Sequence, residues 1–454
     1  MANPLIEVGT GESRLSKLLG DRKEIDRLAR DSGFVRRTPR KLAAEHFLAG
    51  LLQAAATGQR SLRWLALWCG LRCHGTVSRQ NIFKRISDKS TAFLRACLAT
   101  VMTRASNGGL RETLLALPGV LRVLVADSCV LPLHSSLAAV FPGARNQTKR
   151  LYAAAKVQCV LDLLTGAFVD FSLGCFRDND QKAAYDILPV LRAGDLVLRD
   201  LGYFVIGSFL AIAGRGAFFL TRLRHGTALL DEGGQRIDLL SRLRAGAHKP
   251  LVEIAVRAGA AGKLAARLVA VRLDEATVAE RVRRARAQRD KRLKHSKDYE
   301  ELLGWSIMLT NPPAEIGADQ IVPLYGLRWR VEIVFKSWKS HLHLRRPAPA
   351  KTGAAQVRGL LHASLILAVL TTAAHALAAA DRPSHARAGK APQPLSLLKP
   401  LPLIAFAMQC MFMPPLDLTD EIILRQIDYH CRYDSRKRPN FVQKLRQSIL
   451  CALG

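Results

Sequence analysis

Apolar residues recur at helical spacing from the start of the chain to about position 110. Phe47, Leu48 and Leu51 belong to one such series, and Trp64 and Trp68 belong to the next. Side chains at the i, i+3 and i+4 positions share one face of a helix, which favours packing against a core. The chain is therefore predicted to begin with several amphipathic helices.

A third helix is predicted to begin after Ser78, because serine commonly caps helix N-termini. This segment is basic and contains Arg79 and Lys84. A helix, a glycine-containing turn and a basic helix form the outline of a helix-turn-helix, whose second helix enters the major groove of DNA. An ordinary helical bundle with solvated charges explains the same pattern equally well.

From residue 121 the pattern changes to short apolar runs, which are typical of strands. A hairpin is indicated at 164–166, where a Leu-Thr-Gly turn joins two of these runs, and a helical segment follows at 179–192. Strands, a hairpin, a helix and further strands predict an α/β fold with a mixed sheet. The predicted strands cover residues 121–125, 157–163, 167–173, 196–199 and 217–223.

Residues 225–303 interrupt this pattern with hairpin-like stretches and a cationic run, in which 281–297 carries nine positive charges against Asp290. The α/β pattern resumes at 306–309, and a long helix is expected over 318–342. Five regions are therefore predicted: a helical DNA-binding region (1–112), a first core part (113–224), a β-rich basic insertion (225–303), a second core part with the long helix (304–350) and a C-terminal helical region (351–454).

The composition excludes a disordered chain and points to a polyanionic partner. Of 454 residues, 49% are hydrophobic, and 68 Lys and Arg against 37 Asp and Glu leave a net charge of +31. Such a surplus repels itself and is stabilised beside a polyanion, with nucleic acid first and an anionic membrane second. The stretch 360–380 is the most apolar, but His362 and Thr371 interrupt it, which favours a core helix over a membrane span.

The nine cysteines are scattered along the chain and do not form the even-numbered framework of a small disulfide-bonded protein. They are expected to be reduced and mostly buried thiols. The segment 1–14 lacks a basic start followed by an apolar run, so no secretory signal is recognised. Together these features predict a cytoplasmic protein.

Two aspartates occupy similar positions relative to predicted strands. Asp127 follows the apolar run 121–125, and Asp200 follows the run 196–199. Ligands of α/β sheets bind at the carboxyl ends of strands, where both side chains are expected to lie. Asp195 enters its strand at the opposite end and is a poorer candidate. For either aspartate alone, a turn or a helix cap is the simpler interpretation.

A third carboxylate lies on the predicted long helix. Tyr325, Arg328, Glu332 and Lys339 occupy positions i, i+3, i+7 and i+14. At about 100° per residue, these side chains fall within one stripe of about 60°. A stripe of this composition suits a metal ion together with a phosphate backbone, and a solvated charged face is the alternative.

The spacing Tyr-x2-Arg-x3-Glu-x6-Lys resembles the signature of bacterial DDE transposases of the insertion-sequence-four family. Asp127 in VADSCVLPLH and Asp200 in LRDLGYF resemble the first and second catalytic aspartates of that family. The resemblance implies an RNase H-like catalytic core with a mostly β insertion between the second aspartate and the glutamate. The interval from Asp200 to Glu332 is long enough to contain that insertion.

The resemblance also implies roles for single residues. Asp127, Asp200 and Glu332 are expected to bind two divalent ions, Mg²⁺ or Mn²⁺ in its place, which activate the nucleophile and stabilise the leaving oxygen. Phosphate contacts are assigned to Arg328 and Lys339, and a backbone contact to Tyr325. Trp305 precedes the glutamate at a spacing similar to that of a family tryptophan that stacks on a flipped base, and a buried core tryptophan is the equal alternative. Trp329 and Trp338 lie off the polar stripe and are expected in the core. Further DNA contacts are expected from Arg79, Lys84 and Arg284.

The predicted function is that of an insertion-sequence transposase. It cuts DNA at terminal inverted repeats and joins the ends to target DNA, as a homodimer on DNA and without a membrane. A catalytically inactive or nuclease-like relative that only binds or nicks DNA is the alternative. From another class, the charge suits an RNA-binding or nucleoid-structural protein, which has no need for three converging carboxylates.

Overall fold

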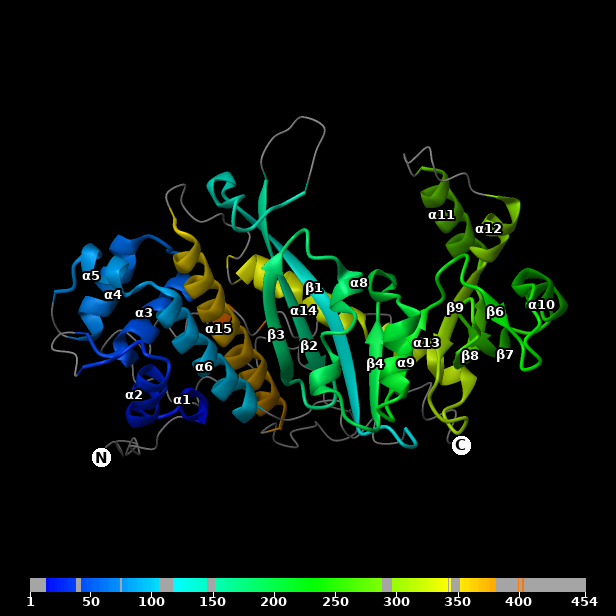
Figure 1. Cartoon of the computed structure of the whole chain (residues 1–454), viewed down its shortest axis with the longest axis horizontal. Coiled ribbons are helices and arrows are strands. Elements are labelled where there is room, and N and C mark those ends of the chain that lie inside the picture. The colour runs from blue at the N-terminus through cyan, green and yellow to red at the C-terminus, as the bar shows by residue number, and fades with distance from the viewer. Residues whose placement is uncertain are drawn as a thin grey trace, which may run out of the picture.

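The computed structural model describes residues 14–37, 42–73, 76–105, 117–144, 152–287, 296–341, 343, 352–380, 399 and 402–403. Helices gather at one end of the molecule, and a long sheet extends toward the other end (Figure 1). The helix α15 (Ala354–Ala380) lies far along the chain but packs against α3 and α6. The helices that precede the sheet are α1 (Arg14–Leu19), α2 (Arg22–Asp31), α3 (Ala44–Thr57), α4 (Leu62–Arg72), α5 (Arg79–Arg85) and α6 (Asp88–Arg104).

Short polar side chains start several of these helices. Asp21 accepts a hydrogen bond from the backbone N–H of Glu24 at the start of α2. Ser61 caps α4 in the same way, and Ser78 accepts from the N–H of Asn81 at the start of α5. Such caps contribute about 1 kcal/mol each, because they satisfy donors that have no partner inside the helix. The predicted basic helix after Ser78 is confirmed.

Within the described residues, nine strands form one mixed sheet in the order β3-β2-β1-β4-β5-β9-β8-β7-β6. The strands β1, β2 and β3 are antiparallel neighbours, whereas β4 runs parallel to β1, and β5 runs parallel to β4. This order and these directions are those of an RNase H-like core, so the predicted fold class is confirmed. The strands are β1 (Arg122–Leu133), β2 (Ala153–Asp162), β3 (Phe168–Cys175), β4 (Asp195–Arg199), β5 (Phe218–Arg222), β6 (Leu229–Leu230), β7 (Leu251–Ala258), β8 (Leu264–Arg272) and β9 (Trp305–Thr310).

Alternate residues of the central strands enter two hydrophobic cores, one on each face of the sheet. Val125 and Leu198 belong to the larger core, together with residues of α14, α15 and the N-terminal helices. Val197 and Phe219 belong to the second core, together with Phe209 of α9. Because both faces are covered, these strands are nearly continuous apolar runs in the sequence. The shorter helices around the sheet are α8 (Asp180–Ala183), α9 (Ile206–Ala213), α10 (Leu239–Ala245), α11 (Glu275–Arg286), α12 (Lys297–Leu302), α13 (Ala318–Gly326) and α14 (Trp329–His341).

The segment 225–303 continues the core sheet. The strands β5 and β9 are neighbours in the sheet, and β9 pairs with β5 on one side and with β8 on the other. The strands β8, β7 and β6 thereby extend the sheet at one edge. This segment also contains α10, α11 and α12, and its cationic run 281–297 lies partly in α11 and partly outside the described residues. The division of the chain into five regions stays a prediction.

The single helix expected over 318–342 is wrong, because the chain forms two helices there. Between α13 and α14 the N–H of Leu327 donates to the carbonyl of Leu324, and the N–H of Arg328 donates to that of Tyr325, each at 3.0 Å. Hydrogen bonds across three residues wind the chain more tightly than an α-helix, so α13 ends at Gly326. The one-helix geometry predicted for the stripe therefore does not hold. A further long helix expected over 179–192 is reduced to α8 and a 3-10 turn at Leu188–Val190.

The helix α15 confirms the core helix predicted near residues 360–380. Within the described residues it is long and apolar enough to cross a membrane, but 78% of its apolar 18-residue stretch is buried inside the protein. Its buried hydroxyls are satisfied within the helix: Ser364 donates to the carbonyl of Leu360 at 2.9 Å, and Thr371 donates to that of Leu367 at 2.7 Å. The helices expected beyond residue 403 lie outside the described residues.

The cysteines of the described residues are free thiols, as expected. Most of them are buried: Cys69, Cys97, Cys129 and Cys159. Burial raises the pKa of Cys69 and of Cys97 to about 12, because the apolar surroundings disfavour a thiolate. These thiols are therefore structural rather than reactive. Three further cysteines, at 410, 431 and 451, lie outside the described residues.

Candidate active site

The two aspartates meet where the parallel pairing of β1 with β4 ends. The last paired residues are Ala126 and Arg199, so Asp127 and Asp200 follow at the same level of the sheet. Asp200 leaves the sheet, as predicted, and begins a short 3-10 turn. Asp127 differs from the prediction: β1 continues beyond it to Leu133, because this half of the strand still pairs with β2. Asp127 therefore lies inside β1, at the point where the pairing with β4 ends and the pairing with β2 continues.

Arg328 brings the first aspartate and the glutamate together. Its Nη1 donates to Oδ2 of Asp127 at 3.3 Å, and its Nη2 donates to Oε1 of Glu332 at 2.7 Å. The Arg328 side chain is 7% exposed. The single positive charge between the two carboxylates offsets part of their mutual repulsion. Glu332 and Asp127 therefore converge from α14 and β1 on one guanidinium group.

Asp200 has a cationic partner that the sequence did not suggest. Nη2 of Arg222, at the end of β5, donates to Oδ1 of Asp200 at 3.2 Å. The parallel register explains this pair, since β5 is the next strand after β4. Arg222 also influences Tyr325: burial raises the pKa of that phenol, and the positive charges of Arg222 and Arg328 oppose the shift. Tyr325 thus lies among the same charges as Asp200.

The three carboxylates influence one another electrostatically. The pKa of Asp127 is raised from 3.8 to about 6, mainly by burial, with further increases from the charges of Asp200 and Glu332. The N–H of Ser128, which donates to Oδ1 of Asp127 at 2.7 Å, and the charge of Arg328 oppose this shift. A carboxyl whose negative form is disfavoured in this way gains from a nearby cation.

The donor set suits a hard divalent ion, because it consists of carboxylate oxygens. Buried polar atoms also lack partners here within the described residues: Nε of Arg328, Nε of Arg222 and the hydroxyl of Tyr325. In this conformation the described residues contain no group of three His, Cys, Asp or Glu side chains arranged to hold one ion. Instead, Asp127 and Glu332 share Arg328. The residues fit a divalent ion by their chemistry.

The remaining residues of the predicted stripe are divided between two helices. Tyr325 is buried at the end of α13, whereas Lys339 is half-buried on α14, two turns beyond Glu332. Trp329, which the sequence assigns to the core together with Trp338, is instead 60% exposed. The guanidinium of Arg328 lies 5.5 Å from the centre of its ring. Trp338 is buried as expected. An exposed aromatic side chain therefore lies beside the arginine that pairs with Asp127 and Glu332.

Trp305 lies in the protein core. It is 8% exposed at the start of β9 and belongs to the second core. The residues of α14 belong to the first core, on the other face of the sheet. Arg281 donates from Nη1 to the Trp305 carbonyl at 3.0 Å. These contacts favour the core interpretation, and base stacking by Trp305 stays a prediction.

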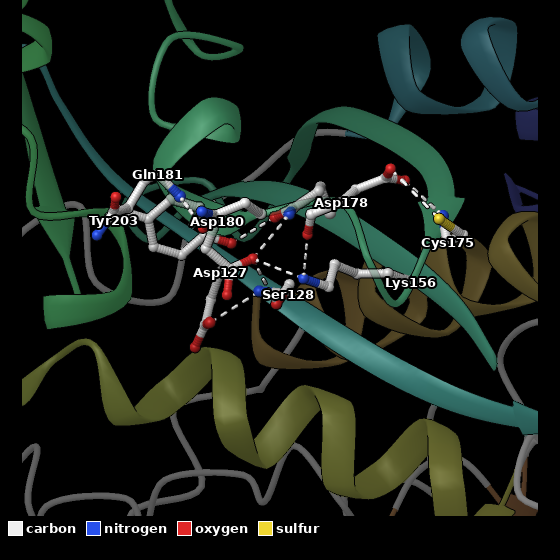
Figure 2. Close-up of polar contacts among 10 residues, drawn as sticks. Asp127, Ser128, Lys156, Cys175, Asp178, Asp180, Gln181 and Tyr203 are labelled. Atoms are coloured by element: carbon white, nitrogen blue, oxygen red, sulfur yellow. Dashed lines mark hydrogen bonds and ion pairs between the residues drawn. The ribbon is translucent and has the colours of Figure 1, made fainter. Parts of the chain in front are cut away.

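A polar network that the sequence did not suggest lies on the face of the sheet opposite α14 (Figure 2). Lys156 of β2 is buried and donates to the backbone carbonyl of Asp178 at 2.6 Å and to Oδ1 of Asp180 at 3.1 Å. Gln158 donates to the same Oδ1 at 3.2 Å and accepts from the hydroxyl of Tyr203. The network joins β2 to α8 and to the turn that follows Asp200. Polar residues at every second position of an apolar run were the signal for it.

Arg199 completes this buried layer directly before Asp200. It is 1% exposed, and its guanidinium lies 4.8 Å from the ring centre of Tyr203. Its Nη2 donates to the carbonyl of Ala184 at 3.1 Å. Burial lowers the pKa of Arg199 to about 10. The contacts of Arg199 with Ala184 and Tyr203 thus fix the end of β4, which restricts where Asp200 can lie.

The other predicted DNA contacts lie away from the carboxylates in the sequence and on other elements. Arg79 and Lys84 are exposed on α5. Arg284 is exposed on α11, and its Nε donates to Oε1 of Glu280 at 2.6 Å. Part of its charge is therefore already compensated. The structure leaves the DNA-binding assignment of these three residues as a prediction.

The sequence model of the transposase DDE domain matches residues 118–369, which is more than half of the chain. This chain belongs to the DDE transposase family. The matched region contains β1, β4 and α14, and so all three carboxylates. DDE transposases generally act with divalent metal ions, in agreement with the oxygen donors described above.

Curated relatives of this DDE transposase include proteins of three bacteria. The transposase of element IS231B from Bacillus thuringiensis subsp. berliner is 28% identical over 339 residues, which cover 70% of each chain. That of IS1151 from Clostridium perfringens is 25% identical over 346 residues, 70% of this chain and 71% of the relative. The putative transposase InsL of IS186A from Escherichia coli (strain K12) is 27% identical over 340 residues, 72% and 84%. A solved piggyBac transposase synaptic complex with hairpin DNA covers 94% of this chain at 12% identity, and its TM-score of 0.42 adds nothing to the assignment.

Proposed function

We propose that this DDE transposase mobilises a bacterial insertion sequence of the insertion-sequence-four type. It cuts DNA at the terminal inverted repeats of the element and joins the ends to target DNA by metal-dependent phosphoryl transfer. One observation carries the proposal: Asp127 and Glu332, which are distant in the chain, converge on Arg328 beside the strand end that bears Asp200. Insertion-sequence transposases are also the relatives described above.

In this proposal Asp127, Asp200 and Glu332 hold the divalent ions, two Mg²⁺ or Mn²⁺ in their place. When bound, these ions activate the attacking oxygen and stabilise the leaving oxygen. The protein positions the carboxylates on a strand, at a strand end and on a helix, which are rigid elements. Arg328 and Lys339 bind phosphates next to the scissile bond, and Tyr325 contacts the backbone there.

Trp329 provides an aromatic surface at the same place. It is 60% exposed, and its neighbour Arg328 contacts two of the carboxylates. A base that stacks on an exposed tryptophan contributes about 1–3 kcal/mol. We therefore assign the base contact near the scissile phosphate to Trp329. Trp305 stays the second candidate, because access to its side chain requires the second core to open.

The transposase is proposed to act in the bacterial cytoplasm as a homodimer on DNA, because the paired ends of an element are cut together. An inactive or nuclease-like relative that only binds or nicks DNA is the second candidate. Its supporting observation is the pairing of Asp127 and Glu332 with Arg328, which occupies oxygens that a metal ion needs.

Cleavage of a DNA duplex that carries the inverted repeats flanking the gene tests the proposal. Wild-type protein is expected to cut at the repeat ends with Mg²⁺ or Mn²⁺ and to join the ends to a target plasmid. For changes to the three carboxylates, the matched control is Asp26→Asn, which changes a partly exposed aspartate on α2 that pairs with Arg30. This variant is expected to cut like wild type. Repeat-specific binding without cleavage supports the inactive relative. Equal binding to any duplex or RNA, again without cleavage, supports an RNA-binding or nucleoid-structural protein.

A further inference from the structure

A hollow of about 370 Å³ lies in the N-terminal helical unit, between the turn after α2 and the junction of α5 with α6. Its lining within the described residues includes no carboxylate. Five basic side chains line it: Arg36, Arg37, Lys84, Arg85 and Lys89. The hollow is separate from the carboxylate site, which is built on β1, β4 and α14.

The floor of this hollow is fixed by buried aromatic packing. Phe34 stacks on Phe93 of α6, with ring centres 5.1 Å apart and 7° between the planes, and lies 5.0 Å from the ring of Phe47 of α3. Gly33 follows α2 in the left-handed conformation, with φ of 67°, and its N–H donates to the carbonyl of Arg30 at 2.8 Å. This turn directs the following basic residues to the rim of the hollow, so the rim is placed by the core.

The basic side chains of the hollow have no acidic partners within the described part of the chain. None of the five forms an ion pair there. Asp88, the acid nearest in sequence to Lys89, lies 3.6 Å from Arg358 of α15 instead. Like charges gathered around one hollow repel each other and therefore favour an anion between them.

Arg85 is less exposed than the other four basic residues of the hollow. It is half-buried, and its guanidinium lies 5.9 Å from the centre of the Phe34 ring. Burial lowers the pKa of this arginine, which shows that the surroundings disfavour the positive charge. A guanidinium retained in such a place is well suited to a phosphate, since it offers planar paired donors. Arg27 and Arg30 on the neighbouring helix α2 are, by contrast, paired with acids of their own.

The exposed face of α5 lies next to this hollow. Arg79, Gln80 and Phe83 are exposed there, and Phe83 is 65% exposed. Lys84, which lines the hollow, directly follows Phe83. A backbone phosphate held in the hollow would place the exposed face of α5 against base edges, where arginine, glutamine and an apolar group can each read a base.

We propose that the hollow formed by Arg36, Arg37, Lys84, Arg85 and Lys89 binds a backbone phosphate of the terminal-repeat duplex and thereby seats α5 in its groove. This inference rests on the proposed function for the identity of the duplex. The phosphate contact itself needs no sequence, because phosphodiesters are the same in every duplex. The two ideas are therefore tested separately.

The first experiment measures the affinity of the full chain for a random-sequence 30-base-pair duplex by fluorescence anisotropy over a range of salt concentrations. The pocket variant changes four exposed cations to Ala: Arg36, Arg37, Lys84 and Lys89. The slope of log Kd against log salt is expected to fall by about 0.9 for each phosphate that the variant no longer binds. Arg85 is left unchanged, because its contact with Phe34 supports the fold.

The matched control variant also removes four exposed cations, but ones that already face acids: Arg22, Arg27, Arg30 and Arg244. Its slope is expected to change by less than half as much, although the net charge falls equally. Melting temperatures within a few degrees of wild type confirm that both variants fold. Equal slopes for the pocket variant and the control overturn the proposal.

The second experiment distinguishes a DNA phosphate from a free one. Single methylphosphonate groups are placed along a terminal-repeat duplex, each of which removes one backbone charge. One or two positions are expected to weaken wild-type binding about tenfold and to have no effect on the pocket variant. If inorganic phosphate raises the melting temperature of wild type alone, while no methylphosphonate position distinguishes the two proteins, the hollow takes free phosphate and the proposal fails. Failure of Mg²⁺-dependent cleavage leaves both binding results interpretable and counts against the proposed function only.

Discussion

Arg328 joins Asp127 and Glu332, with contacts of 3.3 Å to the aspartate and 2.7 Å to the glutamate. The aspartate belongs to β1, and 201 residues separate it from the arginine. The relationship links the central sheet to α14 through one buried charge. It also means that the carboxylates of the candidate site are stable together only with a cation between them.

Removing this guanidinium is expected to damage both stability and activity. Arg328→Ala leaves two carboxylates near each other without a counter-charge, which costs about 1–3 kcal/mol, since Asp127 is mostly buried but Glu332 is partly exposed. Urea unfolding at neutral pH measures this decrease. Repeat-end cleavage is expected to fall at least a hundredfold, because the phosphate contact also disappears. Lys336→Ala, which removes an exposed cation on α14, serves as the control. Wild-type cleavage and stability in Arg328→Ala would contradict the central role of this residue.

The three carboxylates are expected to be needed for cleavage and not for binding. Changing Asp127, Asp200 or Glu332 to Ala should abolish cutting in gel assays, while the affinity for terminal-repeat DNA stays within about twofold. The basic surfaces that bind DNA are untouched by these changes. Normal turnover in any one of the three variants would remove that residue from the site.

Asp195 offers a contrast, because it is a buried acid at the other end of β4. It forms a 2.6 Å ion pair with Arg122. Asp195→Ala should therefore lower stability by about 3–5 kcal/mol, since it leaves the arginine without a partner. At a temperature where the variant remains folded, its cleavage rate per folded molecule should match wild type. A complete absence of cleavage by folded protein would place this aspartate in the catalytic machinery instead.

The stability of the metal-free protein is expected to depend on pH through Asp127. Burial raises the pKa of this carboxyl to about 6 in the folded protein, against 3.8 for an exposed aspartate. The folded state therefore binds the proton more tightly than the unfolded state. The stabilisation of the folded state by this proton is fully present below about pH 4 and is lost as the pH rises to about 6. In EDTA, the free energy of unfolding of Asp127→Asn should therefore change with pH across this window by roughly 3 kcal/mol less than that of wild type. Identical pH profiles for the two proteins would show that the carboxyl titrates normally.

The two tryptophans should respond in opposite ways to truncation. Trp305→Ala removes a side chain buried in the second core, which costs about 3–5 kcal/mol of stability. Trp329→Ala removes a side chain that is 60% exposed, so its melting temperature should change little. Cleavage by Trp329→Ala should nevertheless slow, and a DNA end whose terminal pair is already open should restore part of the rate. A stable Trp305→Ala that such DNA rescues would return the base contact to Trp305.

Several features of this protein follow from the sequence itself. The cap at Ser78, the hairpin turn at 164–166 and the buried helix near 360–380 depend on residues that are neighbours along the chain. Asp200 was placed correctly, because its strand ends within a few residues of it. The charge balance and the four-residue signature predicted the DDE transposase family. Local periodicity and composition suffice for such features, since each is decided by which face of a nearby helix or strand is buried.

The tertiary structure decided where the catalytic candidates lie relative to one another. The hydrogen bonds of β2 carry β1 past Asp127, and a tight turn at residues 327–328 separates Tyr325 from Glu332. Trp329 and Trp305 both lie near the signature in the sequence, yet packing leaves Trp329 exposed and buries Trp305. The Arg222–Asp200 pair requires β5 to lie beside β4, and the Lys156 network requires α8 to fold back over β2. Each of these contacts joins distant segments, and only the register and packing of the sheet determine which distant residues meet.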